Sequence, residues 1–190
     1  MQEKGKYKPK LRLIRGSKDF KISIGFVQIF VAPENTPPFT IEAVAAEEDT
    51  YLVLSAGPEV HETDEDPEQV IAEVEATRPA APGSVIVKGG YPLRLLAIVH
   101  DLNEEPSWKE GWIASALERI FQEVETRKLG SLALPFLGTL HGSLEKQRFL
   151  VLLRDALERK PAGHLKRLWL IAPAFATSAT LKGLEPEMKE

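Results

Sequence analysis

The sequence predicts an α/β domain with a mixed sheet of roughly six strands sandwiched between helices in three layers. From Pro67 onward, short apolar runs alternate with segments of helical spacing, which is the pattern of a helix-covered sheet. The runs over residues 93–100 and 131–134 are apolar almost throughout, as in strands buried on both faces. Gly89 and Gly90 predict a tight turn, and therefore one antiparallel strand pair.

The composition is that of one globular domain. The chain has 190 residues, of which 43% are hydrophobic and 27% charged, so it can bury a core without covalent cross-links. We expect a basic N-terminal extension over residues 1–16, a single domain over 17–176 and a C-terminal tail over 177–190. The absence of cysteine excludes disulfides, thiolate metal sites and cysteine catalysis.

Charge and hydropathy narrow the classes of partner. No apolar run approaches the roughly 18 residues that span a bilayer, and no apolar signal segment follows the basic start of the chain. We therefore expect a cytoplasmic protein. The net charge of −4 argues against a general nucleic-acid binder. The sequence predicts no cofactor and no bound metal.

The N-terminal third contains two predicted strands and one ambiguous segment. Apolar residues over 18–31 occupy one parity and then the other, which indicates a bulge near Gly25–Phe26 or a strand buried on both faces. Residues 40–46 form a predicted buried strand. Residues 51–55 are apolar but too short for periodicity to distinguish a strand from a loop.

Helical spacing predicts three helices, over residues 67–77, 108–128 and 144–159. Asp66, Ser107 and Ser143 precede them and are residue types that cap helix N-termini. Two further strands are predicted over 84–87 and 168–172.

The loop after residues 131–134 is the first candidate site. Ligands of open α/β sheets bind beyond the carboxyl ends of the parallel strands, which points to residues 134–142 and to His100. Gly138 and Gly142 would let backbone amides approach a phosphate, next to a helix N-terminus. The same glycines also suit a packing turn. His100 is either a structural hydrogen bonder or a ligand contact, and His141 either contacts phosphate or is merely exposed.

Glu47, Glu48 and Asp49 form an acidic cluster at a predicted strand end. Paired carboxylates can perform acid–base chemistry or hold a metal, but exposed acids at a strand end are also common. The sequence contains no Ser-His-Asp order, no His-Glu-x-x-His motif, no Walker loop and no dinucleotide fingerprint.

Several of these segments resemble macro domains. Residues 82–93 follow that family's pattern of Pro-Gly, a strand and Gly-Tyr-x-Leu, and residues 96–100 resemble its next strand, which ends in His. Residues 131–139 look like its second ligand loop, and 41–44 look like the strand before its first. The resemblance implies a mixed sheet between helices with a cleft for ADP-ribose or a related nucleotide. Some members only bind the ligand, whereas others remove ADP-ribose from proteins or small products.

The family's key residues are only partly present. The resemblance places its adenine-reading Asp at Phe26, whose ring could stack on a base, and its catalytic Asn near Asp49. Of the first-loop glycines, Gly57 remains, followed by a proline that lacks a backbone donor. In the second loop, Gly138 and Thr139 match, whereas a leucine stands where a further glycine is usual.

The sequence thus gives one set of candidate residues and three hypotheses for function. The candidate ligand contacts are Phe26, Gly57, Gly138, Thr139, His141 and Gly142. Asp49 is the candidate catalytic residue. The first hypothesis is a macro-like binding module for a nucleotide or phosphate-bearing small molecule. The second is a ligand-less scaffold that acts through protein contacts or a homodimer. The third is an ADP-ribosyl or phosphoester hydrolase.

Overall fold

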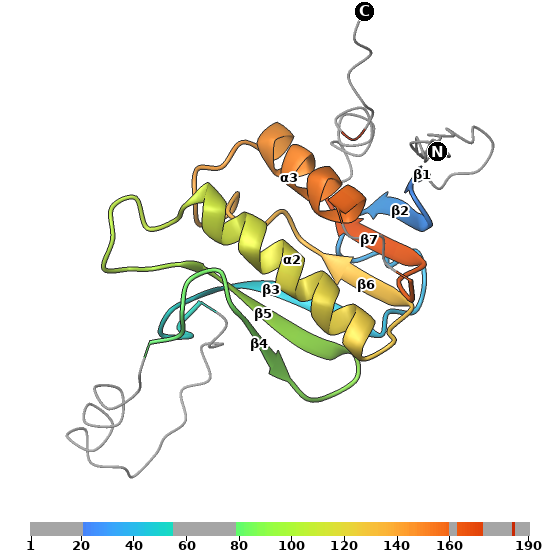
Figure 1. Cartoon of the computed structure of the whole chain (residues 1–190), viewed down its shortest axis with the longest axis horizontal. Helices are drawn as coiled ribbons and strands as arrows, with labels where there is room; N and C mark the ends of the chain where they lie inside the picture. The colour runs from blue at the N-terminus through green and yellow to red at the C-terminus, as the bar shows by residue number, and fades with distance from the viewer. Residues whose placement is uncertain (1–20, 55–78, 160–162, 173–183, 185–190) are drawn as a thin grey trace, which may run out of the picture.

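The fold is built on one mixed β-sheet with helices packed against it (Figure 1). The computed structural model describes residues 21–54, 79–159, 163–172 and 184. Within these residues the strands are β1 (Lys21–Ile24), β2 (Val27–Ala32), β3 (Ala43–Asp49), β4 (Val85–Lys88), β5 (Leu93–His100), β6 (Ser131–Leu134) and β7 (Arg167–Ile171). The helices are α2 (Glu110–Thr126) and α3 (Lys146–Arg159). The strands form a seven-stranded sheet in the order β1-β2-β7-β6-β3-β5-β4.

The prediction of a mixed sheet is confirmed. The central strands β2, β7, β6, β3 and β5 run parallel, and the edge strands β1 and β4 pair antiparallel with their neighbours. The sheet has one strand more than expected because residues 21–32 form a hairpin, where a single strand was predicted over 18–31. Gly25, at a φ of 58°, and Phe26 turn the chain, so that Ile24 pairs with Val27. The reversal shifts the parity of the buried side chains, and this shift is what suggested a bulge.

Several predicted element bounds need correction. β5 and β6 span the predicted residues, but β3 is displaced toward the C-terminus and residues 51–54 are not a strand. The second and third helices begin at Glu110 and Lys146, so Ser107 and Ser143 are not their caps. The carbonyl of Ser107 instead accepts a bond from Asp101, and the hydroxyl of Ser143 accepts one from Trp108. Both serines are therefore engaged by other partners at positions where the local sequence favours a helix start.

The core lies between one face of the sheet and the helices α2 and α3 (Figure 1). Buried residues of α2 repeat at helical spacing: Ile113, Ala116, Leu117, Ile120, Phe121 and Val124. On the other face of the sheet, Leu96, Ile98 and Trp169 are buried as well. The helix predicted over residues 67–77 lies outside the described residues, so the second helical layer stays a prediction.

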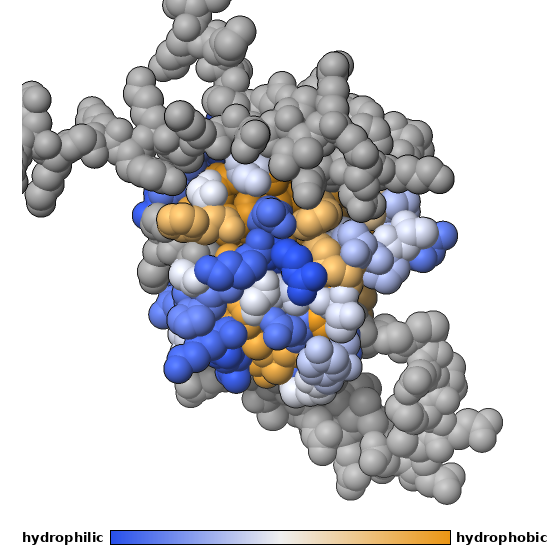
Figure 2. All heavy atoms as spheres, turned by 90° about the vertical axis from the view of Figure 1, so that its right-hand side faces the viewer, coloured by the Kyte–Doolittle hydropathy of each residue, from blue (hydrophilic) through white to orange (hydrophobic). Residues whose placement is uncertain are grey.

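The surface of the described residues is mixed in polarity. Figure 2 shows the side that lies at the right in Figure 1, where hydrophobic side chains form separate patches among hydrophilic ones. Among the described residues, no helix is long and apolar enough to cross a membrane.

Candidate functional site

Three loops that follow parallel strands meet at one edge of the sheet. They begin after Asp49 of β3, His100 of β5 and Leu134 of β6. These residues are the carboxyl ends of three strands that lie side by side in the sheet. The first two loops are joined by a hydrogen bond of 2.9 Å from the Asn103 side-chain amide to the Tyr51 hydroxyl. This is the edge at which open α/β sheets bind ligands, as the sequence predicted.

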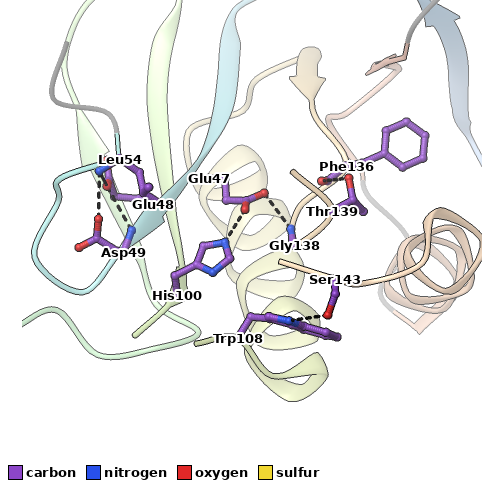
Figure 3. A network of polar contacts seen from close by, with 10 residues as sticks. All are labelled: Glu47, Glu48, Asp49, Leu54, His100, Trp108, Phe136, Gly138, Thr139 and Ser143. Carbon is purple, nitrogen blue, oxygen red and sulfur yellow. Dashed lines mark hydrogen bonds and ion pairs between the residues drawn. The ribbon is translucent and has the colours of Figure 1, made fainter. Parts of the chain in front are cut away.

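Glu47 connects all three strands at this edge (Figure 3). Its Oε2 accepts a hydrogen bond of 2.8 Å from the backbone N–H of Gly138, and its Oε1 pairs with Nε2 of His100. The side chains of Glu47 and His100 are 8% and 2% exposed, so the pair is shielded from bulk water. A carboxylate that accepts a backbone amide in a buried setting forms a strong, charge-assisted bond. His100 is therefore a structural hydrogen bonder, one of the two roles considered for it.

A register shift between β3 and β5 makes this pair possible. Glu47 and Glu48 lie opposite Ala97 and Ile98, but Asp49 lies opposite His100, so one residue of β5 is extra. In an unbroken register His100 would share the face of Glu48, because successive side chains alternate. A one-residue shift moves a side chain to the other face, which brings His100 to the face of Glu47.

Asp49 and Glu48 organise the loop that follows β3. The carboxylate of Asp49 accepts backbone N–H bonds from Tyr51, Val53 and Leu54 at 2.6, 3.0 and 3.0 Å. Glu48 accepts bonds from Leu54 at 2.8 Å and from Asp49 at 3.1 Å. Both acids are fully buried, not solvent-exposed. Their contacts give Asp49 a clear structural task, and nothing in this geometry singles it out as a catalytic group.

Packing requires two glycines in the loop after β6. Gly138 has a φ of 76°, and a Cβ there would lie 2.3 Å from Cδ1 of Ile113. A Cβ on Gly142 would lie 2.4 Å from the carbonyl oxygen of Gly138 and 3.0 Å from the Trp108 ring. These contacts support the packing-turn interpretation of both glycines. Close approach of a ligand is not needed to explain them.

Two other candidates lie on the same loop. The Thr139 hydroxyl donates to the Phe136 carbonyl at 2.9 Å, which closes the turn. His141 is exposed, and its ring lies edge-on to His100 with 6.2 Å between the centroids. Leu140 between them is 79% exposed. The structure thus brings Thr139 and His141 next to the Glu47–His100 pair.

Phe26 is not brought to this site. It lies in the turn before β2, at the edge of the sheet opposite the carboxyl ends of the parallel strands, and is 67% exposed. The first long parallel strand is β2, which ends at Ala32, so the residue that follows it is Pro33 and the first acid is Glu34. The resemblance placed the family's adenine-reading residue at Phe26, and this placement is wrong because the chain reverses there in the β1–β2 hairpin. Gly57 lies outside the described residues.

Sequence reasoning missed the partners of the acidic cluster. The contact between Glu47 and Gly138 joins residues 91 positions apart, and no local pattern indicates it. The signal that the sequence offers is an acidic residue at the end of one strand together with a glycine in the loop after another strand. Within the described residues, no group of three or more His, Asp or Glu side chains is arranged to hold a metal ion.

Comparison with solved structures identifies the fold. An Oceanobacillus iheyensis macrodomain, solved as a mutant with ADPR, matches with a TM-score of 0.64 at 15% identity, over 87% of this chain and 96% of its own. The same macrodomain with ADP matches with a TM-score of 0.61 at 16% identity, over 87% and 94%. The macrodomain of Thermus aquaticus DarG matches with a TM-score of 0.53 at 19% identity, over 76% and 98%. No family profile and no curated protein matches the sequence.

The fold and the site together define an α/β protein with three loops gathered at the carboxyl edge of a mixed sheet. The solved structures show that this architecture is the macrodomain fold. The expectation drawn from the resemblance is thereby confirmed for the fold.

Proposed function

We propose that this chain is a binding module for a nucleotide-like, phosphate-bearing small molecule, which lies across the loops after β3, β5 and β6. The observation that carries the proposal is the convergence of these loops at the carboxyl edge, tied together by Glu47 and by the Asn103–Tyr51 bond. Supporting it, structures with the same fold have been solved with ADPR and with ADP.

The exposed residues around this edge suit a ligand with a flat base and hydroxyl groups. Tyr51 and Leu140 offer apolar surface, since they are 37% and 79% exposed. His141 supplies a polar ring that can contact a hydroxyl or a phosphate. Glu34, which is exposed and follows β2, is proposed in place of Phe26 as the residue that meets the base, and its carboxylate can accept a hydrogen bond from a base amino group.

A second candidate function is a scaffold that has lost its ligand and acts through protein contacts. The observation favouring it is that internal carboxylates already accept the amides of Gly138, Tyr51, Val53 and Leu54. A hydrolase is less well supported, because both oxygens of Asp49 are engaged by backbone amides.

Isothermal calorimetry with ADP-ribose, AMP, ADP and adenosine tests the proposal. We expect saturable binding that is weakened by His141→Ala. His164→Ala is the matched control, because His164 is also exposed but precedes β7, at the other edge of the sheet. Gly138 is unsuitable for this test, since any side chain there meets Ile113. Absence of heat with all four compounds would reject the binding module and leave the scaffold.

A further inference from the structure

The Glu47 carboxylate sits where an anion would bind to the loop after β6. It is held from two sides, by the Gly138 N–H at 2.8 Å and by His100, in surroundings from which water is largely excluded. A backbone N–H in a turn with a positive φ, such as that of Gly138, is a suitable donor for a phosphate oxygen. In this chain that donor already has an anionic acceptor, which is part of the protein.

A phosphate and Glu47 would compete for the same position. One N–H cannot form two full hydrogen bonds, and two negative groups about 4 Å apart repel strongly where the effective dielectric constant is low. The loop after β3 shows the same arrangement, because Asp49 and Glu48 accept the backbone amides of Val53 and Leu54. In both loops, therefore, backbone amides that could meet an anion already donate to internal carboxylates: Gly138 in one loop, and Val53 and Leu54 in the other.

We infer that Glu47 is a specificity-determining residue that occupies the anion position of the loop after β6 and keeps phosphate away from Gly138. The inference rests on the proposed function in its choice of site. The Glu47 carboxylate thereby sets the class of ligand group that meets this loop. That group is uncharged and bears hydroxyls, as a ribose does, so that it can donate to Glu47. The ligand's phosphate then contacts other parts of the edge.

Removing the carboxylate should create an anion site. Glu47→Ala leaves the Gly138 N–H and His100 without their partner, and Glu47→Gln removes the charge but keeps the side chain's size. The matched controls are Glu42→Ala and Glu42→Gln. Glu42 directly precedes β3 and likewise accepts backbone amides, from Gly130 and Ser131, at the opposite end of the sheet.

The measurement is the amide NMR shift of Gly138 during titration with inorganic phosphate, together with calorimetry of ADP and adenosine. We expect no phosphate-dependent shift in the wild type or the Glu42 variants. In Glu47→Ala the dissociation constant for phosphate should be lower by about tenfold or more, with a smaller gain in Glu47→Gln. If Glu47→Ala does not fold, the Gln variant decides.

Two results would overturn the inference: phosphate shifting Gly138 equally in the wild type, or no gain in whichever Glu47 variants fold. Failure of the proposed function has a different signature. If the wild type binds neither adenosine nor ADP-ribose while Glu47→Ala gains phosphate binding at Gly138, the role of Glu47 stands and the binding module does not.

Discussion

The side chain of Glu47 accepts the backbone N–H of Gly138 at 2.8 Å, although the two residues are 91 positions apart in the chain. The same carboxylate pairs with His100 on the neighbouring strand β5. One acid on β3 thus holds the loop after β6 and the end of β5 together, at the end of the sheet where open α/β folds bind ligands. These contacts tie three neighbouring strands together at this end of the sheet.

The first prediction concerns the energy of this buried pair. Glu47→Ala and His100→Ala should each lower the free energy of unfolding by about 3 kcal/mol, because each leaves a buried polar partner unpaired. The double variant should lose less than the sum, with a coupling of about 1–3 kcal/mol. Equilibrium urea unfolding of the four proteins measures the coupling. Strictly additive losses would show that the two side chains act independently.

The second prediction separates packing from binding at Gly138. Gly138→Ala should destabilise the protein by about 2–4 kcal/mol, since its Cβ meets Ile113 and the backbone has a positive φ. Ile113→Val removes the Cδ1 atom that lies 2.3 Å from that Cβ, so it should partly restore stability in the double variant. Thermal unfolding compares the variants.

Gly89→Ala, in the turn between β4 and β5, is the matched control for Gly138→Ala, because nothing lies within 4 Å of a Cβ at Gly89. It should change the stability by less than about 1 kcal/mol. If Gly138→Ala is tolerated as well as Gly89→Ala, the packing explanation of the loop glycine is wrong.

The third prediction concerns Asp49 as the organiser of the loop after β3. Asp49→Ala removes the acceptor of the Tyr51, Val53 and Leu54 amides, so hydrogen exchange at these amides should become at least about tenfold faster. Asp101→Ala serves as the comparison, since Asp101 accepts the Asn103 amide in the neighbouring loop. Unchanged exchange at residues 51–54 would contradict the structural role and reopen a chemical one.

The fourth prediction is a pH dependence at Glu125. Desolvation by partial burial raises the pKa of this carboxyl, but hydrogen bonds from the backbone and side chain of His164 and from Leu165 outweigh it and hold the pKa below 4.5. A folded-state pKa below the unfolded value adds stability above the unfolded pKa, and this stability is lost as the pH falls through the folded pKa. Glu125 should therefore stabilise the protein at neutral pH and cease to do so in acid.

Glu125→Gln measures this contribution. The variant should be less stable than the wild type by about 1 kcal/mol near neutral pH. The difference should shrink as the pH falls below the unfolded-state pKa and on through the lowered folded-state pKa, as the wild-type carboxyl becomes protonated. Denaturant unfolding across this range gives the two curves, and a constant offset between them would exclude the carboxyl's charge as the cause.

The elements best predicted from the sequence are those whose burial is uniform. β5 and β6 consist almost entirely of apolar residues, so their bounds follow from composition alone. Residues 18–31 were harder, because a two-residue turn at Gly25 and a bulge both change the parity of a strand. Ser107 and Ser143 have the chemistry of helix caps, but tertiary partners engage their carbonyl and hydroxyl groups instead.

The position of the candidate loops in the fold could be predicted better than the contacts of their side chains. The rule for the carboxyl ends of parallel strands identified the loop with Gly138, and the acids at 47–49 were recognised as a cluster. Their partners could not be predicted, because they depend on a register shift between β3 and β5 and on long-range contacts. The same shift placed His100 beside Glu47, whereas strand alternation alone would have separated them.

The position of β7 in the sheet constrains the order in which the chain can assemble. β7 is the last strand described, yet it lies between β2 and β6 and pairs with both. The β1–β2 hairpin therefore cannot join the sheet during synthesis until β7 has left the ribosome. Until then β2 exposes an unpaired edge, which makes nascent chains that stall before β7 especially prone to aggregate.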